Sequence, residues 1–222
     1  MYANHFRPKK NPSIGVVQIC SSDNIEDNYN KIKYFVNDCV EKGAKLVCLP
    51  ENFASMSSSS LASSQIAEPL DGPIMTKYSS LAKELKVWLS LGGFQEKIDA
   101  NPLKRYNTHV IINDEGQIVS AYRKLHLFDI DLSKAGGVAL SESEFVEKGM
   151  DMPEIVDSPL GKLGPTIVSF FCDIVSYDFI QCYDVRFPEL YRKCIPLGNT
   201  NEMQSYRKSS LCSGFGLNWP AQ

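Results

Sequence analysis

The chain has 222 residues and lacks the features that mark several large protein classes. Its 23 basic and 26 acidic residues give a net charge of only −3, so nothing in the composition favours nucleic acid as a partner. No apolar run approaches the roughly 18 residues of a membrane-spanning helix. Residues 1–10 also lack the apolar core of a secretory signal. We therefore expect a cytoplasmic protein, with a mitochondrial pool as the alternative, that binds neither nucleic acid nor membrane.

Close cysteine and histidine pairs are missing as well. The three histidines are dispersed and no Cys-x-x-Cys occurs, which argues against a zinc site. Seven cysteines, an odd number with several in apolar runs, are typical of reduced thiols and not of a disulfide framework. Cys20, Cys39 and Cys48 are expected in the core. The sequence implies neither metal nor cofactor.

Apolar strands and helices alternate in the first half of the chain. Hydrophobic residues make up 43% of the sequence, enough for a substantial core and too many for a disordered chain. Runs rich in β-branched residues at 14–20 and 45–50 flank a helical pattern, with Ser22 or Asp23 as its cap and Gly43 as its stop. Strand, helix and strand in this order predict a βαβ unit.

The following segments continue the alternation. Small polar residues at 57–64 predict a loop, and helical spacing predicts a second helix over 74–86. A strand is expected at 87–94, followed by a hairpin of residues 106–113 and 117–124. With no internal repeat and no linker, we expect one α/β domain.

Three chemically different residues follow or open strand-like segments: Glu51, Lys124 and Cys182. A carboxylate can take the proton of a thiol, and a lysine ammonium lowers the thiol pKa and stabilises an oxyanion. Together they could form and hydrolyse an acyl thioester. The spacing alone favours the plainer alternative, in which Glu51 lies in a loop, Lys124 is solvated and Cys182 is a buried apolar residue.

The motifs around these residues carry more information than their spacing. Glu51 lies in CLPENF, Lys124 in YRKLHLFDIDL and Cys182 in CYDVRFPELYR. In this order they resemble the signatures of the nitrilase superfamily of carbon–nitrogen hydrolases, over about residues 13–193. The segments VWLSLGGF and SPLGKLG resemble the Nit branch, and within it the deaminated glutathione amidases more than the ω-amidases.

This resemblance implies an αββα sandwich, usually dimeric, that hydrolyses a small amide to an acid and ammonia or an amine. By motif, Glu51 would be the general base, Lys124 the oxyanion stabiliser and Cys182 the nucleophile. Glu142 would support the lysine, although a solvated residue in an acidic loop is an equally good interpretation. The Tyr183 backbone N–H would complete the oxyanion hole.

Three further residues have open interpretations. Arg186 would face a substrate carboxylate, or else form a structural ion pair with Asp184 or Glu189. His126 is interpreted as structural, because the family pattern uses no catalytic histidine. Cys172, in FFCDI, is interpreted as a buried residue, because no Tyr and no Arg-Phe-Pro follow it.

Two departures from the family pattern are evident. Val168 stands where the nucleophile is expected, and residues 168–181 form an apolar insert of 14 residues before Cys182. Residues 194–222 are polar, without apolar periodicity, and diverge from the family. We therefore expect an incomplete second half of the sandwich, which puts a family-like homodimer in question.

Two alternatives to an active amidase follow. One is a catalytically inactive truncated isoform. The other is a hydrolase of the isochorismatase type, which also pairs a lysine with a cysteine but needs an aspartate on the first strand, and residues 14–20 contain none.

Overall fold

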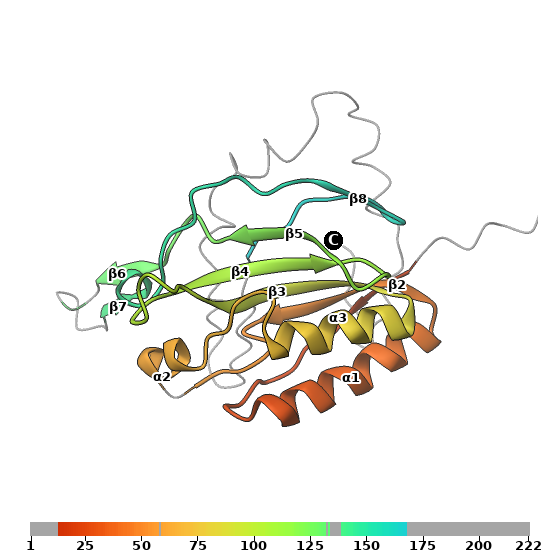
Figure 1. Cartoon of the computed structure of the whole chain (residues 1–222), viewed down its shortest axis with the longest axis horizontal. Helices are drawn as coiled ribbons and strands as arrows, with labels where there is room; N and C mark the ends of the chain where they lie inside the picture. The colour runs from red at the N-terminus through yellow and green to blue at the C-terminus, as the bar shows by residue number, and fades with distance from the viewer. Residues whose placement is uncertain (1–12, 58, 132, 134–138, 168–222) are drawn as a thin grey trace, which may run out of the picture.

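The computed structural model describes residues 13–57, 59–131, 133 and 139–167. This part of the chain forms a five-stranded sheet in the order β1-β2-β3-β4-β5, with helices on one face (Figure 1). The bounds of these strands are Ser13–Val16 (β1), Ala44–Glu51 (β2), Trp88–Lys97 (β3), Arg105–Ile112 (β4) and Ile118–Arg123 (β5). The first three strands run parallel, whereas β4 and β5 are antiparallel to their neighbours.

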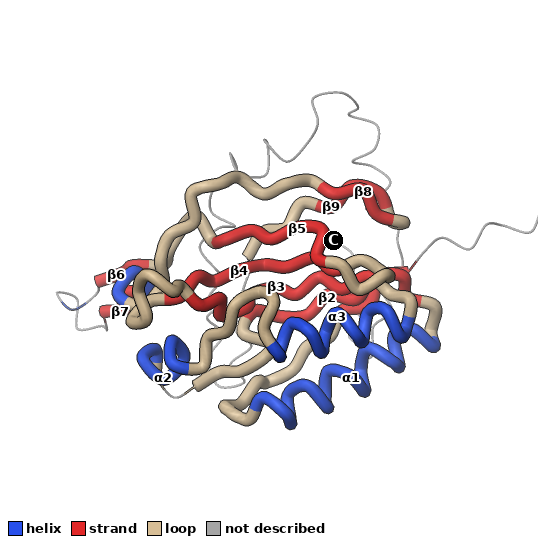
Figure 2. Tube along the Cα trace, in the orientation of Figure 1, coloured by secondary structure: helices blue, strands red, loops and turns tan. Residues whose placement is uncertain are grey.

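Three helices and two small hairpins complete the described part. The helices span Ile25–Glu41 (α1), Ser60–Gln65 (α2) and Pro73–Leu85 (α3). The hairpins pair Asp129–Asp131 (β6) with Ala139–Ser141 (β7), and Val156–Ser158 (β8) with Gly161–Leu163 (β9). Figure 2 shows α1 and α3 together on one side of the strands, with β8 and β9 on the other. None of the described helices is long and apolar enough to cross a membrane.

The main core lies between the sheet and the two long helices. Alternate residues of β2, β3 and β4 point toward the helices, as the period of two along a strand requires. Ile32 and Val36 of α1 are completely buried against them. Tyr78 of α3 packs edge-on against Phe53, with ring centroids 5.0 Å apart. This core holds the carboxyl end of β2 in place.

An irregularity in β3 changes which side chains face the helices. Leu91 and Phe94 are three residues apart, yet both belong to the helix-side core. Strict alternation would place them on opposite faces. The β3–β4 pairing shifts register between these two residues, at Gly92 and Gly93, and such a bulge re-aims the side chains that follow it. Gln95 therefore lies where an uninterrupted strand would not have placed it.

The face of the sheet opposite the helices has a row of hydrogen-bonded polar groups surrounded by apolar side chains. Nε2 of His109 lies 2.8 Å from the Ser90 hydroxyl oxygen, and Nδ1 lies 2.7 Å from the Thr166 backbone oxygen. Since a carbonyl oxygen only accepts, Nδ1 carries the proton and Nε2 accepts from Ser90. The neutral ring is thus fully paired, and burial lowers the pKa of His109 to about 4.

This histidine makes the stability of the fold dependent on pH. An unfolded histidine takes up a proton near pH 6.5, whereas His109 stays neutral until about pH 4. The contribution of His109 to the free energy of unfolding is therefore fully present above about pH 6.5. It is lost as the pH falls toward 4, by about 3 kcal/mol in total. Urea unfolding between pH 7 and 4 measures this slope. His109→Gln should flatten it over that interval, and an unchanged slope would contradict the assignment.

Most predicted elements are confirmed, with three corrections. The helix α1 is capped by Asn24, whose side chain accepts from the backbone N–H groups of Glu26 and Asp27, and not by Ser22 or Asp23. Residues 60–65, predicted as part of a loop, form α2, because Ser59 caps a short helix there. The first strand ends at Val16, so Cys20 lies beyond it and is exposed instead of buried in the core.

Candidate active site

The carboxyl end of β2 borders a small polar cavity of about 90 Å³. Its walls come from the ends of β2 and β3, the start of β4 and the turn after β7. The residues that line it are Glu51, Asn52, Gln95, Arg105, Asn107, Glu142, Phe145 and Val146. A volume of this size suits a few waters or one polar group of a ligand. Sites of α/β folds form at this edge of a sheet.

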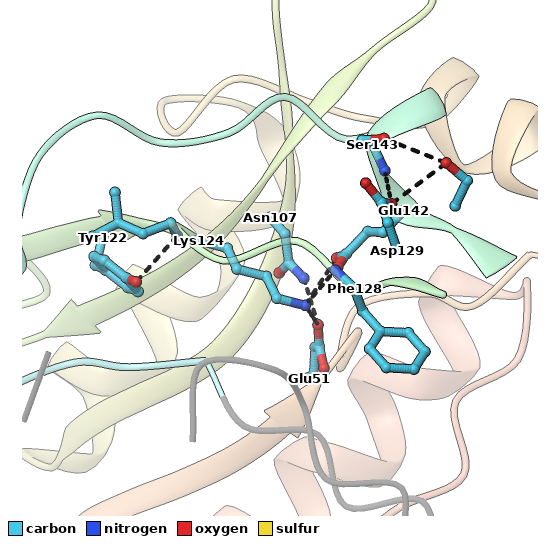
Figure 3. A network of polar contacts seen from close by, with 10 residues as sticks. Glu51, Asn107, Tyr122, Lys124, Phe128, Asp129, Glu142 and Ser143 are labelled. Atoms are coloured by element: carbon cyan, nitrogen blue, oxygen red, sulfur yellow. Dashed lines mark hydrogen bonds and ion pairs between the residues drawn. The ribbon is translucent and has the colours of Figure 1, made fainter. Parts of the chain in front are cut away.

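Lys124 lies between two carboxylates at this cavity (Figure 3). Its Nζ donates to both carboxylate oxygens of Glu142, at 2.9 and 2.8 Å, and lies 3.9 Å from Oε1 of Glu51. The lysine side chain is only 2% exposed and that of Glu51 only 7%. Charges withdrawn from water to this degree require partners, and here the ammonium of Lys124 offsets the negative charge of both carboxylates.

The end of the β5 strand fixes the lysine from the backbone side. The Lys124 N–H donates to the carbonyl of Asn107 at 2.9 Å, and its carbonyl accepts from Gly149 at the same distance. The bond to Asn107 extends the pairing of β4 and β5 by one residue, and the bond from Gly149 fixes the other side of the Lys124 backbone. The lysine therefore has a defined position before any ligand binds.

Glu51 is held by its neighbours on the adjacent strands. It pairs in register with Gly93 of β3, and one of its carboxylate oxygens accepts a hydrogen bond from the Asn107 amide nitrogen. A Cβ at Gly93 would lie 2.6 Å from Cγ of Glu51 and 2.7 Å from Oδ1 of Asn107. Only glycine leaves room for both side chains, so this position determines where the carboxylate lies.

Glu142 begins a single 3-10 turn, residues Glu142–Glu144, directly after β7. Its Oε2 also accepts from the backbone N–H of Phe128 at 2.7 Å, and its own N–H donates to the Phe128 carbonyl at 3.1 Å. These reciprocal bonds orient the carboxylate toward Lys124. Of the two interpretations of Glu142, the structure favours the one in which it supports the lysine.

Arg105 brings a second positive charge to the cavity. Its Nη1 donates to the Ser64 hydroxyl of α2 at 2.9 Å, and its backbone pairs with Phe145 and Glu147 at 3.0 and 2.8 Å. Burial lowers the pKa of the guanidinium, and the negative charge of Glu142 offsets part of that effect. With Arg105 and Lys124 facing Glu51 and Glu142, the formal charges around the cavity sum to zero.

The structure thus brings together Glu51, Lys124 and Glu142 among the residues singled out from the sequence. Cys182, Tyr183 and Arg186, together with Cys172, lie outside the described residues. His126 lines a separate, larger cavity of about 400 Å³ beside the turn after β5.

Sequence patterns did not reveal Gln95, Arg105 or Asn107. The one available signal was polarity, since each interrupts or begins a mostly apolar strand. Polar residues in strands are common enough that this signal does not single them out. Their proximity to Glu51 depends on strand register and on the bulge in β3, which only the structure supplies.

The sequence of this chain matches a known protein family. The model of the carbon-nitrogen hydrolase family matches residues 13–200. The chain belongs to this family. Deaminated glutathione amidases from Dictyostelium discoideum and Rattus norvegicus are 46% and 35% identical to it, over 80% and 84% of this chain. Those matches cover 57% and 53% of the relatives, so the chain spans little more than half their length.

Solved structures of two related proteins have the same fold as this chain. The Caenorhabditis elegans NitFhit protein superimposes with a TM-score of 0.68 at 36% identity, over 82% of this chain and 41% of that one. Saccharomyces cerevisiae Nit3, described as a nitrilase superfamily member, gives 0.59 at 28% identity, over 82% and 61%. The predictions of an α/β fold of the nitrilase type and of a carbon–nitrogen hydrolase lineage are confirmed.

Proposed function

We propose that this chain hydrolyses the amide of deaminated glutathione, or of a close relative, through a thioester on Cys182. The observation that carries the proposal is the grouping of Glu51, Lys124 and Glu142 around one small cavity at the carboxyl end of β2. The similarity to two deaminated glutathione amidases supports the choice of substrate. The role of Cys182 rests on its motif and on the chemistry that the other residues require.

In the first half of the reaction, Glu51 takes the proton of the Cys182 thiol. The thiolate attacks the amide carbonyl carbon, and the carbonyl oxygen becomes an oxyanion. The Lys124 ammonium and the backbone N–H of Tyr183 bind that oxyanion. The ammonium donates two hydrogen bonds to Glu142, which hold Nζ of Lys124 in place. Loss of one such donor raises the barrier by about 2.7–4 kcal/mol in other hydrolases.

In the second half, Glu51 returns the proton to the departing nitrogen and the C–N bond breaks. The acyl group remains on sulfur as a thioester. Glu51 then removes a proton from water, which attacks the thioester carbonyl, and the acid leaves as the thiol re-forms. The proton that Glu51 took from water passes to the departing thiolate, so one carboxylate serves twice as base and twice as acid, and no cofactor takes part.

Arg105 makes the site compatible with an anionic amide, because its charge brings the formal charge around the cavity to zero. Without Arg105, the groups around the cavity would carry a net formal charge of −1 and repel a carboxylate. A guanidinium can bind a carboxylate through two parallel hydrogen bonds. Arg186, if it faces the cavity as its motif implies, would add a second such group.

The test compares two amides with the purified 222-residue chain. Release of cysteinylglycine from deaminated glutathione is measured beside release of ammonia from α-ketoglutaramate. We expect kcat/KM to be at least about tenfold higher for deaminated glutathione, because this larger substrate can make more contacts with the protein. The opposite preference would indicate an ω-amidase. Hydrolysis of neither amide would refute the proposal and favour an inactive isoform.

A further inference from the structure

The Gln95 side chain carries a buried acceptor at the candidate active site. Gln95 is 9% exposed and lines the same cavity as Glu51 and Glu142. Its Nε2 donates to the Ser55 backbone oxygen at 3.2 Å and to Oδ1 of Asn52 at 3.4 Å. Its Oε1 is buried and has no hydrogen-bond partner among the described residues.

The orientation of this amide group is determined by its neighbours. Rotating the group by half a turn would exchange oxygen and nitrogen, so a carboxamide orientation must be assigned from its contacts. The Ser55 contact is a backbone oxygen, which only accepts, so it requires Nε2 to face it, and the orientation of the Asn52 carboxamide follows from that assignment. The Oε1 atom is therefore the one left for another partner, and buried acceptors in native proteins nearly always have one.

Of the other groups that line the cavity, the two carboxylates narrow the chemistry of that partner, whereas the Arg105 guanidinium would bind a different, accepting part of the ligand. Glu51 and Glu142 contribute carboxylate oxygens, which are acceptors like Gln95 Oε1. A ligand group next to all three must offer N–H or O–H donors. The group that the proposed reaction brings to Glu51 is an amide nitrogen, which carries such a donor and receives another proton when it leaves.

We propose that Gln95 Oε1 accepts a hydrogen bond from the N–H of the amide that is cleaved, and so holds the leaving nitrogen beside Glu51. This inference rests on the proposed function. As the nitrogen takes a proton from Glu51 it gains positive charge, and its N–H becomes a stronger donor. The bond to Gln95 is therefore tighter in the transition state than in the bound substrate, which is the condition for raising kcat.

An ester of the same acid separates this role from a structural one, because its leaving oxygen bears no hydrogen. The probes are glutaramate and monomethyl glutarate, tested with the wild-type chain, Gln95→Met and Gln95→Glu. Methionine removes the acceptor and the donor of Gln95, whereas glutamate keeps the acceptor, removes the donor and adds a negative charge. We expect Gln95→Met to lower the ratio of amide to ester kcat/KM by at least about tenfold. The ratio for Gln95→Glu should stay within about threefold of the wild type.

A binding measurement keeps this inference distinct from the catalytic proposal. In the Cys182→Ala background, calorimetry should show tighter binding of glutaramate than of monomethyl glutarate, and Gln95→Met should abolish that difference. This result would support the inference even if the wild-type chain hydrolysed nothing. If the chain hydrolyses glutaramate and Gln95→Met leaves the amide-to-ester ratio unchanged, the inference is wrong and the function stands. Equal binding of both probes, or of neither, would also overturn it.

Discussion

Replacing Lys124 with methionine should lower both the stability of the fold and the rate of amide hydrolysis by large factors. The side chain is 2% exposed and binds both oxygens of Glu142, while Glu51 lies 3.9 Å away. Methionine has a similar length and no charge, so it leaves two carboxylates close together without a cation between them. Removing one partner from a buried ion pair costs about 3–5 kcal/mol. Urea unfolding at pH 7 measures this loss.

The effect on catalysis has a separate cause. Lys124→Met removes the ammonium proposed to bind the oxyanion, and kcat/KM should fall by about a hundredfold to a thousandfold or more. The double variant Lys124→Met with Glu142→Gln distinguishes the two losses. Neutralising Glu142 removes one of the unpaired charges, so much of the stability should return while activity remains low.

A matched control uses an ion pair of the same length at the surface. Lys162 contacts Asp157 at 2.8 Å, but the two side chains are 55% and 85% exposed. Lys162→Met should change stability by less than about 1 kcal/mol and leave hydrolysis unaffected. If Lys124→Met were as mild as Lys162→Met, the buried lysine would have neither of its proposed roles.

Local sequence patterns were sufficient for the elements with strong periodicity. Alternation and turn signals predicted the β4–β5 hairpin, and helical spacing predicted α1 and α3. The same patterns failed at Ser59, where a single capping hydroxyl starts a short polar helix that has no apolar stripe. Such a helix depends on its cap and its tertiary contacts, which periodicity does not measure.

The candidate site was predictable only in part, for a comparable reason. Motifs identified Glu51, Lys124 and Glu142 individually, and the structure then brought them together. The face that Gln95 takes depends on the bulge at Gly92–Gly93, and Asn107 lies opposite Gln95 because the shifted register pairs these two residues. The two glycines are a sequence signal for a bulge, but they do not determine which of the following side chains change face.

The identity of the nucleophile depends on how the chain continues beyond Ile167. Ile167 is completely buried in a cluster with Tyr122 and Leu125, and Leu125 directly follows Lys124. Ile167 therefore packs beside the residue that follows Lys124. Cys172 and Cys182 follow Ile167 by 5 and 15 residues, and an extended chain can span about 17 and 50 Å over such lengths. Reach alone permits either cysteine, so the choice rests on their motifs.

Cys182→Ala should reduce kcat/KM for the amide by at least about 10⁴-fold, because without a nucleophile no thioester forms. Cys172→Ala should keep activity within about threefold, and the reverse pattern would make Cys172 the nucleophile.

Alkylation by iodoacetamide at neutral pH, followed by mass spectrometry, gives an independent measurement. Burial raises the pKa of Cys48 to about 11, so that thiol should stay unmodified. Labelling of Cys182 should be fast, and a bound substrate should slow it.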